Sequence, residues 1–391
     1  MEDSGKKRSF RKGLVLGMVL AAAAFCLSGC ATAFLLPRFA GGGSSGGKQI
    51  DAKIQELNQY IEEYYLFDYE EEDVENGIYK GLMAGLGDVY TGYYTPEEYA
   101  SFMESSNGSY SGIGAMMQQD YTTGIITVVR VFDDSPSAEA GMQPGDVLYE
   151  VEGEEVTGQD LSLVVSDLKG EEGTQVRISI VRGAEVLEMT LTRKSIQVPT
   201  VESRMIKDEI GYIAITEFDD VTEEQFMVAL SSLEMQGMKK LIVDLRDNGG
   251  GLVDVTCAIL DRLLPEGLIV YTEDKFGNRQ VDRWDEENFF VCGLAVLVNG
   301  NSASASEIFA GAVKDYGVGT LIGTKTFGKG IVQSLFPLPD GSAVKITVSR
   351  YYTPAGNNIH EVGITPDIVV EAGEDPEEDR QLQKAIEVLS R

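Results

Sequence analysis

The chain has 391 residues, of which 43% are hydrophobic and 24% charged, so neither wholesale disorder nor a polytopic membrane protein fits. This length predicts two or three domains. The formal net charge of −31 would repel phosphate backbones and argues against a nucleic-acid partner. A single histidine, His360, excludes an HExxH zinc helix, and the four cysteines show no CxxC spacing. We therefore expect no metal and no cofactor, and we expect His360 to be structural.

The first 36 residues have the pattern of an exported, membrane-bound chain. Residues 1–12 are predicted to be a cytoplasmic basic tail, and the mostly apolar residues 13–36 are long enough to cross a bilayer of about 30 Å as a transmembrane signal anchor. Because basic flanks stay cytoplasmic, we expect a single-pass protein of the cell membrane, with the bulk of the chain extracytoplasmic. Lipidation at Cys30, in a segment similar to a lipobox, and a fully cleaved leader remain alternatives. Residues 37–47 are a predicted Gly/Ser linker.

Residues 48–104 have a helical pattern and predict a small helical arm. Apolar residues recur there at spacings of three and four: Ile50, Ile54, Leu57 and Ile61. The cluster of Tyr90, Tyr93 and Tyr94 is best explained by an amphipathic helix that packs on its own core. A homodimer formed through this arm is an open alternative.

Residues 105–193 predict a compact β-rich module. Short strands are expected at 125–131, 147–151, 176–181 and 186–191, with one helix near 161–168. The stretch Ser135–Val156 resembles the middle of a PDZ domain, and Gly112, Ile113 and Gly114 lie where such domains place their carboxylate-binding loop. Glycines let successive backbone N–H groups converge on a peptide carboxylate, although the triplet alone is also compatible with a simple turn.

Residues 194–391 alternate strands with helices, which predicts an α/β sheet covered by helices, with a helix at the C-terminal end. Strands are expected at 210–216, 241–245 and 294–298, and helices at 223–233, 253–264 and 306–315. Two strand-to-helix junctions, Arg246–Gly251 and Asn299–Glu307, would present backbone N–H groups to a developing oxyanion. Taken locally, the first loop is equally a turn, and Ser304–Glu307 is equally a capping box.

A third segment, Thr326–Gln333, favours a catalytic role for these two loops over a purely structural one. The order RDNGGG, VNGNSASASEI and GTKTFGKGIVQ resembles the carboxyl-terminal processing proteases, also called tail-specific proteases. The likeness covers about residues 48–370 and closes on Gly363–Asp367. It implies a multidomain α/β protein: an N-terminal membrane helix, a helical arm, and a PDZ domain inserted before a crotonase/ClpP-like protease core.

The resemblance also implies roles for individual residues. Ser304 would be the nucleophile, Lys329 the general base and Gln333 the residue that orients the base. The interval of 329 − 304 = 25 residues is like that of the family and singles out Ser304 among the three serines of its loop. The backbone N–H groups of Gly250 and Ala305 would form the oxyanion hole.

A lysine base requires a special environment. Keeping the amine neutral near pH 7.5 costs about 4 kcal/mol, because the usual lysine pKa is about 10.4. We therefore expect Lys329 to lie in a dry pocket, with Gln333 as an uncharged hydrogen-bond partner.

The resulting hypothesis is a membrane-tethered serine endopeptidase in which the PDZ module captures proteins with apolar C-termini. Two alternatives remain open at this point. One is a PDZ adaptor with an inert protease core, and the other is a crotonase-like acyl-CoA enzyme.

Overall fold

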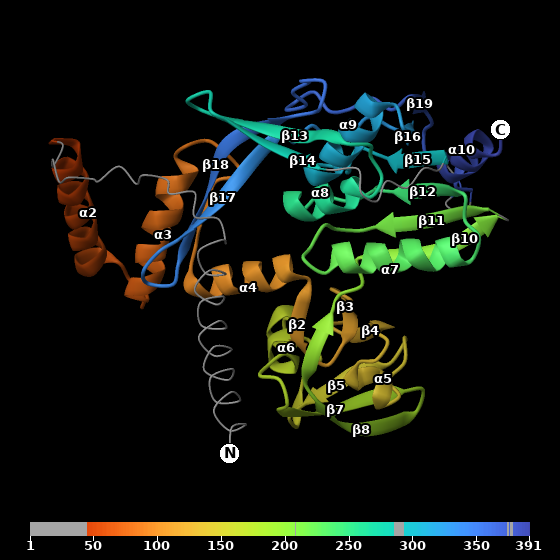
Figure 1. Cartoon of the computed structure of the whole chain (residues 1–391). Coiled ribbons are helices and arrows are strands. Elements are labelled where there is room, and N and C mark those ends of the chain that lie inside the picture. Colours follow the sequence, from red (N-terminus) through yellow and green to blue (C-terminus); the bar gives the residue numbers. More distant parts are fainter. Residues whose placement is uncertain (1–44, 208, 285–292, 374, 376–377) are drawn as a thin grey trace, which may run out of the picture. The chain divides into compact units, whose positions relative to one another are not determined.

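The computed structural model describes residues 45–207, 209–284, 293–373, 375 and 378–391 (Figure 1). The predicted basic tail and signal anchor, residues 1–36, lie outside the described residues. Among the residues that are described, no helix is both long and apolar enough to cross a membrane. The chain divides into two compact units, residues 1–70 and 71–391.

In the first unit, helix α2 spans Ser45–Tyr64 and therefore begins inside the predicted linker. Of the four apolar residues whose spacing predicted this helix, Ile50 is 60% and Leu57 is 52% exposed, whereas Ile54 and Ile61 are partly buried. After the helix, Tyr65 packs edge-on against the rings of Phe67 and Tyr69.

The second unit starts with α3 (Glu71–Ala84), β1 (Gly92–Tyr94) and α4 (Pro96–Asn107). The prediction that the tyrosine cluster lies in a self-contained helix is wrong. Tyr93 and Tyr94 are in β1, which pairs antiparallel with β18 (Ala343–Tyr352) of the core. The arm therefore contributes an edge strand to a distant sheet, because a β-hydrogen-bond ladder satisfies backbone groups that a short helix would leave unpaired at its ends.

The β-rich module follows and confirms the predicted strands. Strand β2 (Ser109–Gly112) pairs with β9 (Lys194–Gln197) where the chain enters and leaves the module. The main sheet has the order β3-β4-β5-β7-β8, with β6 beside β5. Its strands are Ala115–Gln119, Ile126–Val131, Val147–Val151, Glu154–Glu155, Gln175–Arg182 and Glu185–Thr192, in the order β3 to β8. Helices α5 (Pro136–Glu139) and α6 (Leu161–Leu168) complete the module, whose core includes fully buried Ile126 and Val164.

The third part is the predicted α/β sheet, with strand order β10-β11-β12-β15-β16-β19. All of its pairings are parallel except that of the edge strand β10. The strands are β10 (Val201–Lys207), β11 (Ile210–Ile215), β12 (Lys240–Asp244), β15 (Gly293–Val298), β16 (Gly319–Gly323) and β19 (Ile368–Val369). The helices are α7 (Thr222–Met235), α8 (Val253–Asp261), α9 (Ala305–Tyr316) and α10 (Arg380–Leu389), and Figure 1 shows α7 running alongside β10 and β11.

Alternating residues of β12 divide the core between the two faces of this sheet. Leu241 and Val243 pack with α7, α8 and α9, whereas Ile242 packs with α10. A second sheet has the order β1-β18-β13-β14, with β17 also paired to β18. Its remaining strands are β13 (Gly267–Asp274), β14 (Arg279–Trp284) and β17 (Ile331–Pro337).

Strands β12 and β15 are parallel neighbours, with Asp244 opposite Leu297. Their carboxyl ends therefore open on the same edge of the sheet, which is where ligand sites of α/β folds gather. This register brings the RDNGGG and NGNSASASE loops together.

Candidate active site

Asn248 joins the two loops, and its role was not foreseen. The side chain is fully buried, and its amide donates to the Ile215 carbonyl at 2.9 Å. The backbone carbonyl of Asn248 accepts hydrogen bonds from the backbone N–H of Ala303 and from the Ser306 hydroxyl, both at 3.0 Å. One asparagine thus holds the glycine loop against the serine loop.

The structure separates the three serines of the second loop. Ser302 and Ser306 are fully buried, and their hydroxyls donate to the carbonyls of Leu245 and Asn248. Ser304 is partly exposed and has φ 56° and ψ −115°, a conformation that non-glycine residues rarely adopt. Such strain is found at nucleophiles that must project from a tight strand-to-helix turn.

Gly250 packs directly against the serine turn. Its φ is +108°, and a Cβ atom placed there would lie 2.8 Å from the Ser304 Cβ and 3.0 Å from the Ala305 nitrogen. The structure thus brings together the three residues predicted for the nucleophile and the oxyanion hole. The Gly250 N–H is already engaged, however, because it donates to the Asn248 side-chain oxygen at 2.8 Å. An oxyanion held by Gly250 would share this donor with Asn248.

Lys329 lies half-buried in the loop before β17, with its Nζ 4.7 Å from the centre of the Tyr90 ring. Burial lowers the pKa of Lys329, and the positive charge of Lys345 lowers it further, while the carboxylate of Asp88 acts in the opposite direction. The lowered pKa has the direction that a general base needs. The nearby carboxylate, however, differs from the uncharged surroundings expected from the sequence.

Gln333 belongs to a hydrogen-bonded cluster beside this lysine. Its amide donates to the Thr347 hydroxyl of β18 at 3.2 Å, and the Thr347 N–H donates to the hydroxyl of Thr91 at 3.1 Å. Thr91 in turn donates to Asp88 at 2.7 Å. Among the described residues, no hydrogen bond joins Gln333 to Lys329, and none joins the side chains of Lys329 and Ser304. Segment 88–91 is a part of the site that sequence patterns did not indicate.

In the β-rich module, the predicted carboxylate loop is built around a tight approach at Gly114. Its φ is +76°, and a Cβ atom there would lie 2.3 Å from the Ser135 Cβ. The carbonyl of buried Ile113 accepts a hydrogen bond from Ser137 N–H at 2.9 Å, while Gly112 ends β2. The loop therefore has no space for side chains at Gly114.

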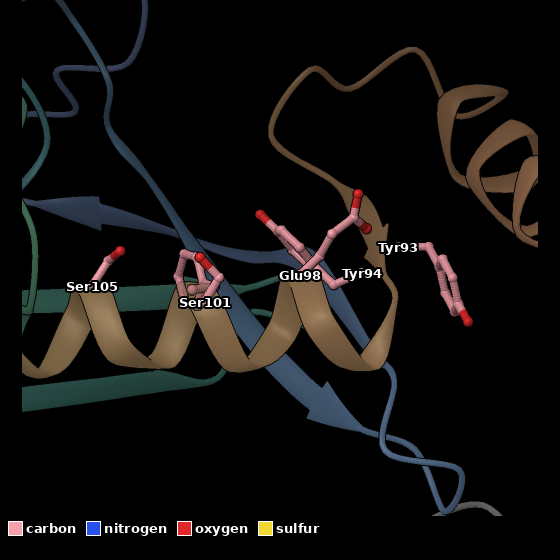
Figure 2. Close-up of a pocket in the computed structure, with 6 residues that line it drawn as sticks. Tyr93, Tyr94, Glu98, Ser101 and Ser105 are labelled. Carbon is pink, nitrogen blue, oxygen red and sulfur yellow. The ribbon is translucent and has the colours of Figure 1, made fainter. Parts of the chain in front are cut away.

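A separate cavity of about 410 Å³ lies on the arm, between β1 and α4 (Figure 2). Figure 2 shows Tyr93 and Tyr94 on the strand side, and Glu98, Ser101 and Ser105 along the helix. The Lys345 Nζ lies 5.2 Å from the centre of the Tyr94 ring, so the same lysine contacts the lining of this cavity and lowers the pKa of Lys329.

Comparisons with known proteins agree with this architecture. Residues 127–182 match the family model of the PDZ domain, and residues 209–370 match that of peptidase family S41. A solved structure described as the photosystem II D1 C-terminal processing protease is 30% identical, covering 86% of this chain and 91% of that chain with a TM-score of 0.50. The chain belongs to peptidase family S41. The resemblance to carboxyl-terminal processing proteases is thereby confirmed, and the acyl-CoA alternative loses its support.

Other relatives in the family extend this result. A probable CtpA-like serine protease of Staphylococcus saprophyticus is 34% identical over 82% of this chain and 65% of the relative. Its counterpart in Staphylococcus aureus strain COL is 33% identical over 82% of this chain and 64% of the relative. The chain thus spans slightly less than two thirds of these relatives. A putative S41 protease of Bacteroides fragilis, 17% identical with a TM-score of 0.50, shares the fold over 80% of this chain and 90% of that chain.

Proposed function

We propose that this protein is a serine endopeptidase that cleaves proteins near their C-termini. The observation that carries the proposal is the packing of Gly250 against Ser304 and Ala305, which places a partly exposed serine with a strained backbone at the start of α9. Membership of peptidase family S41 supports the same chemistry.

In the proposed reaction, the Ser304 hydroxyl attacks the carbonyl carbon of the scissile peptide, and its proton passes to the neutral amine of Lys329. The negative charge on the carbonyl oxygen is stabilised by the N–H groups of Ala305 and Gly250. The Lys329 ammonium then gives its proton to the leaving amine, so that the C–N bond breaks and an acyl-enzyme remains. Water hydrolyses this ester and regenerates the Ser304 hydroxyl. Gln333 would orient the lysine indirectly, because Thr347 and Thr91 connect it by hydrogen bonds to Asp88, whose charge acts on Lys329.

The PDZ module would select the substrate. Backbone N–H groups of Gly112, Ile113 and Gly114 would bind the terminal carboxylate, and the tail would add as a strand to the edge of the module. We extend the proposal to substrates with apolar C-terminal tails. We also extend it to tethering by residues 13–36 and to an extracytoplasmic location, and the basic and apolar composition of residues 1–36 supports these two points.

The proposal is tested with the full-length protein in detergent and a folded substrate that ends in an apolar tail. Ser304→Ala and Lys329→Ala are expected to abolish cleavage while thermal unfolding stays close to that of the wild type. Lys325→Ala, an exposed lysine of the same loop, is the matched control and should cleave normally. Retained cleavage in either active-site variant contradicts the mechanism. If wild type cleaves nothing and a fluorophosphonate probe leaves Ser304 unlabelled, the inert-adaptor alternative is correct.

A further inference from the structure

Glu307 connects the serine loop to the lysine loop through a single buried carboxylate. The side chain is fully buried in the first turn of α9. Its Oε2 accepts the backbone N–H of Ser304 at 3.0 Å and the backbone N–H of Lys329 at 2.8 Å. Its Oε1 accepts the N–H of Gly328 at 2.8 Å and the hydroxyl of Thr326 at 2.6 Å.

Tyr351 contacts the same two residues through their carbonyl groups. Its hydroxyl lies 2.9 Å from the Ser304 carbonyl oxygen and is also within hydrogen-bond distance of the Lys329 carbonyl oxygen. A phenol has one proton, so the hydroxyl donates to one carbonyl at a time while staying in contact with both. Burial raises the pKa of Tyr351, and the Glu307 carboxylate adds to this effect, so the hydroxyl keeps its proton.

We propose that Glu307 and Tyr351 are positioning residues that set the separation of the nucleophile and the base, an inference that rests on the proposed function. One carboxylate oxygen ties the two N–H groups together, and one hydroxyl bridges the two carbonyls. The main chains of Ser304 and Lys329 are thereby held from both sides. Because the side chains start from these fixed positions, the distance the proton must travel depends on this clamp.

A simple helix cap does not account for these contacts. A capping box requires of the glutamate only that it accept the N–H of the N-cap residue, here Ser304, which precedes α9. Three of the four donors to Glu307 instead come from residues 326–329, in a loop that leads to the other sheet. Four hydrogen bonds and the positive end of α9 also offset the cost of burying the charge.

Two variants test the clamp. Tyr351→Phe removes only the hydroxyl, and Glu307→Gln places an amide NH₂ against one of the two pairs of donors. The matched control is Tyr316→Phe, which also loses a tyrosine hydrogen bond to a backbone carbonyl, at the far end of the same helix. The readouts are kcat and KM for a tail-bearing substrate, the rate at which a fluorophosphonate labels Ser304, and thermal unfolding.

We expect kcat and the labelling rate to fall by about tenfold to a hundredfold in both variants, with KM within twofold of wild type and the control unchanged. A Tyr351→Phe enzyme as fast as the Tyr316→Phe control would overturn the proposal. If Glu307→Gln does not fold, the rates of Tyr351→Phe alone decide whether the clamp positions the nucleophile and the base. Cleavage that persists in Ser304→Ala would defeat the proposed function instead, a result that differs from an unchanged Tyr351→Phe rate.

Discussion

Substituting alanine at Gly250 gives a direct test of how the serine turn is held. The added methyl group would lie 2.8 Å from the Ser304 Cβ and from the Ala303 carbonyl oxygen. Carbon atoms normally approach to about 3.5–4.0 Å, so the serine turn must move by about 1 Å. The φ of +108° adds about 1–2 kcal/mol of backbone strain, and overpacking adds about 1–3 kcal/mol.

A displacement of about 1 Å at a nucleophile costs about a hundredfold in rate. We therefore expect Gly250→Ala to lower kcat for a tail-bearing substrate about a hundredfold and to lower the free energy of unfolding by about 3 kcal/mol. Gly249→Ala is the control, because no atom lies within 4 Å of its added methyl group and its backbone is not in the left-handed region. Steady-state kinetics and denaturant unfolding measure both effects. The reasoning is refuted if the two variants lose the same activity, or if Gly250→Ala keeps wild-type kcat.

Two further predictions concern the base and the PDZ loop. Lys329 must be neutral to act, so kcat/KM rises as pH passes through its pKa. Lys345→Met removes a charge that lowers this pKa and should move the rising limb to higher pH, whereas Asp88→Asn should move it to lower pH. At a fixed pH below the limb each change is expected to be about fivefold, corresponding to about 1 kcal/mol of charge interaction, and shifts of the same sign would contradict it. Gly114→Ala should raise KM for a tail substrate about tenfold without changing kcat, because its added methyl group has no space. Gly141→Ala, which has nearly the same φ but open surroundings, should leave KM unchanged, and equal KM values for the two variants would argue against the PDZ loop as the tail site.

Local patterns were sufficient to predict much of the fold. The strands predicted in the PDZ module and in the α/β core are short apolar runs bounded by turn residues, so each could be recognised from its own segment. Strand β1 escaped prediction for the opposite reason. It has three residues, and its partner β18 begins at Ala343, so nothing within the arm records the pairing. The tyrosines of β1 have a β-propensity that helical spacing nearby obscured.

The candidate site also has parts that the sequence predicted and parts that it did not. Motif order was enough to propose Ser304 and Lys329, because both lie in segments that resemble a family. The charges around the lysine could not be proposed in this way. Asp88 comes from the arm and Lys345 from β18, and only folding brings them beside Lys329. The net charge of −31 was therefore a poor guide to the pKa of the lysine, which is set first by burial and then by two neighbouring charges of opposite sign.

Glu307 shows how a correct local prediction can hide a wider role. The sequence SASE predicts a capping box, and Glu307 does accept the Ser304 N–H. The pattern does not contain the second loop, which contacts the same carboxylate through the Lys329 N–H in the folded structure. A cap alone would need neither Tyr351 nor a carboxylate with both oxygens occupied from outside the helix. The same side chain that starts α9 thus couples the start of that helix to the position of the base.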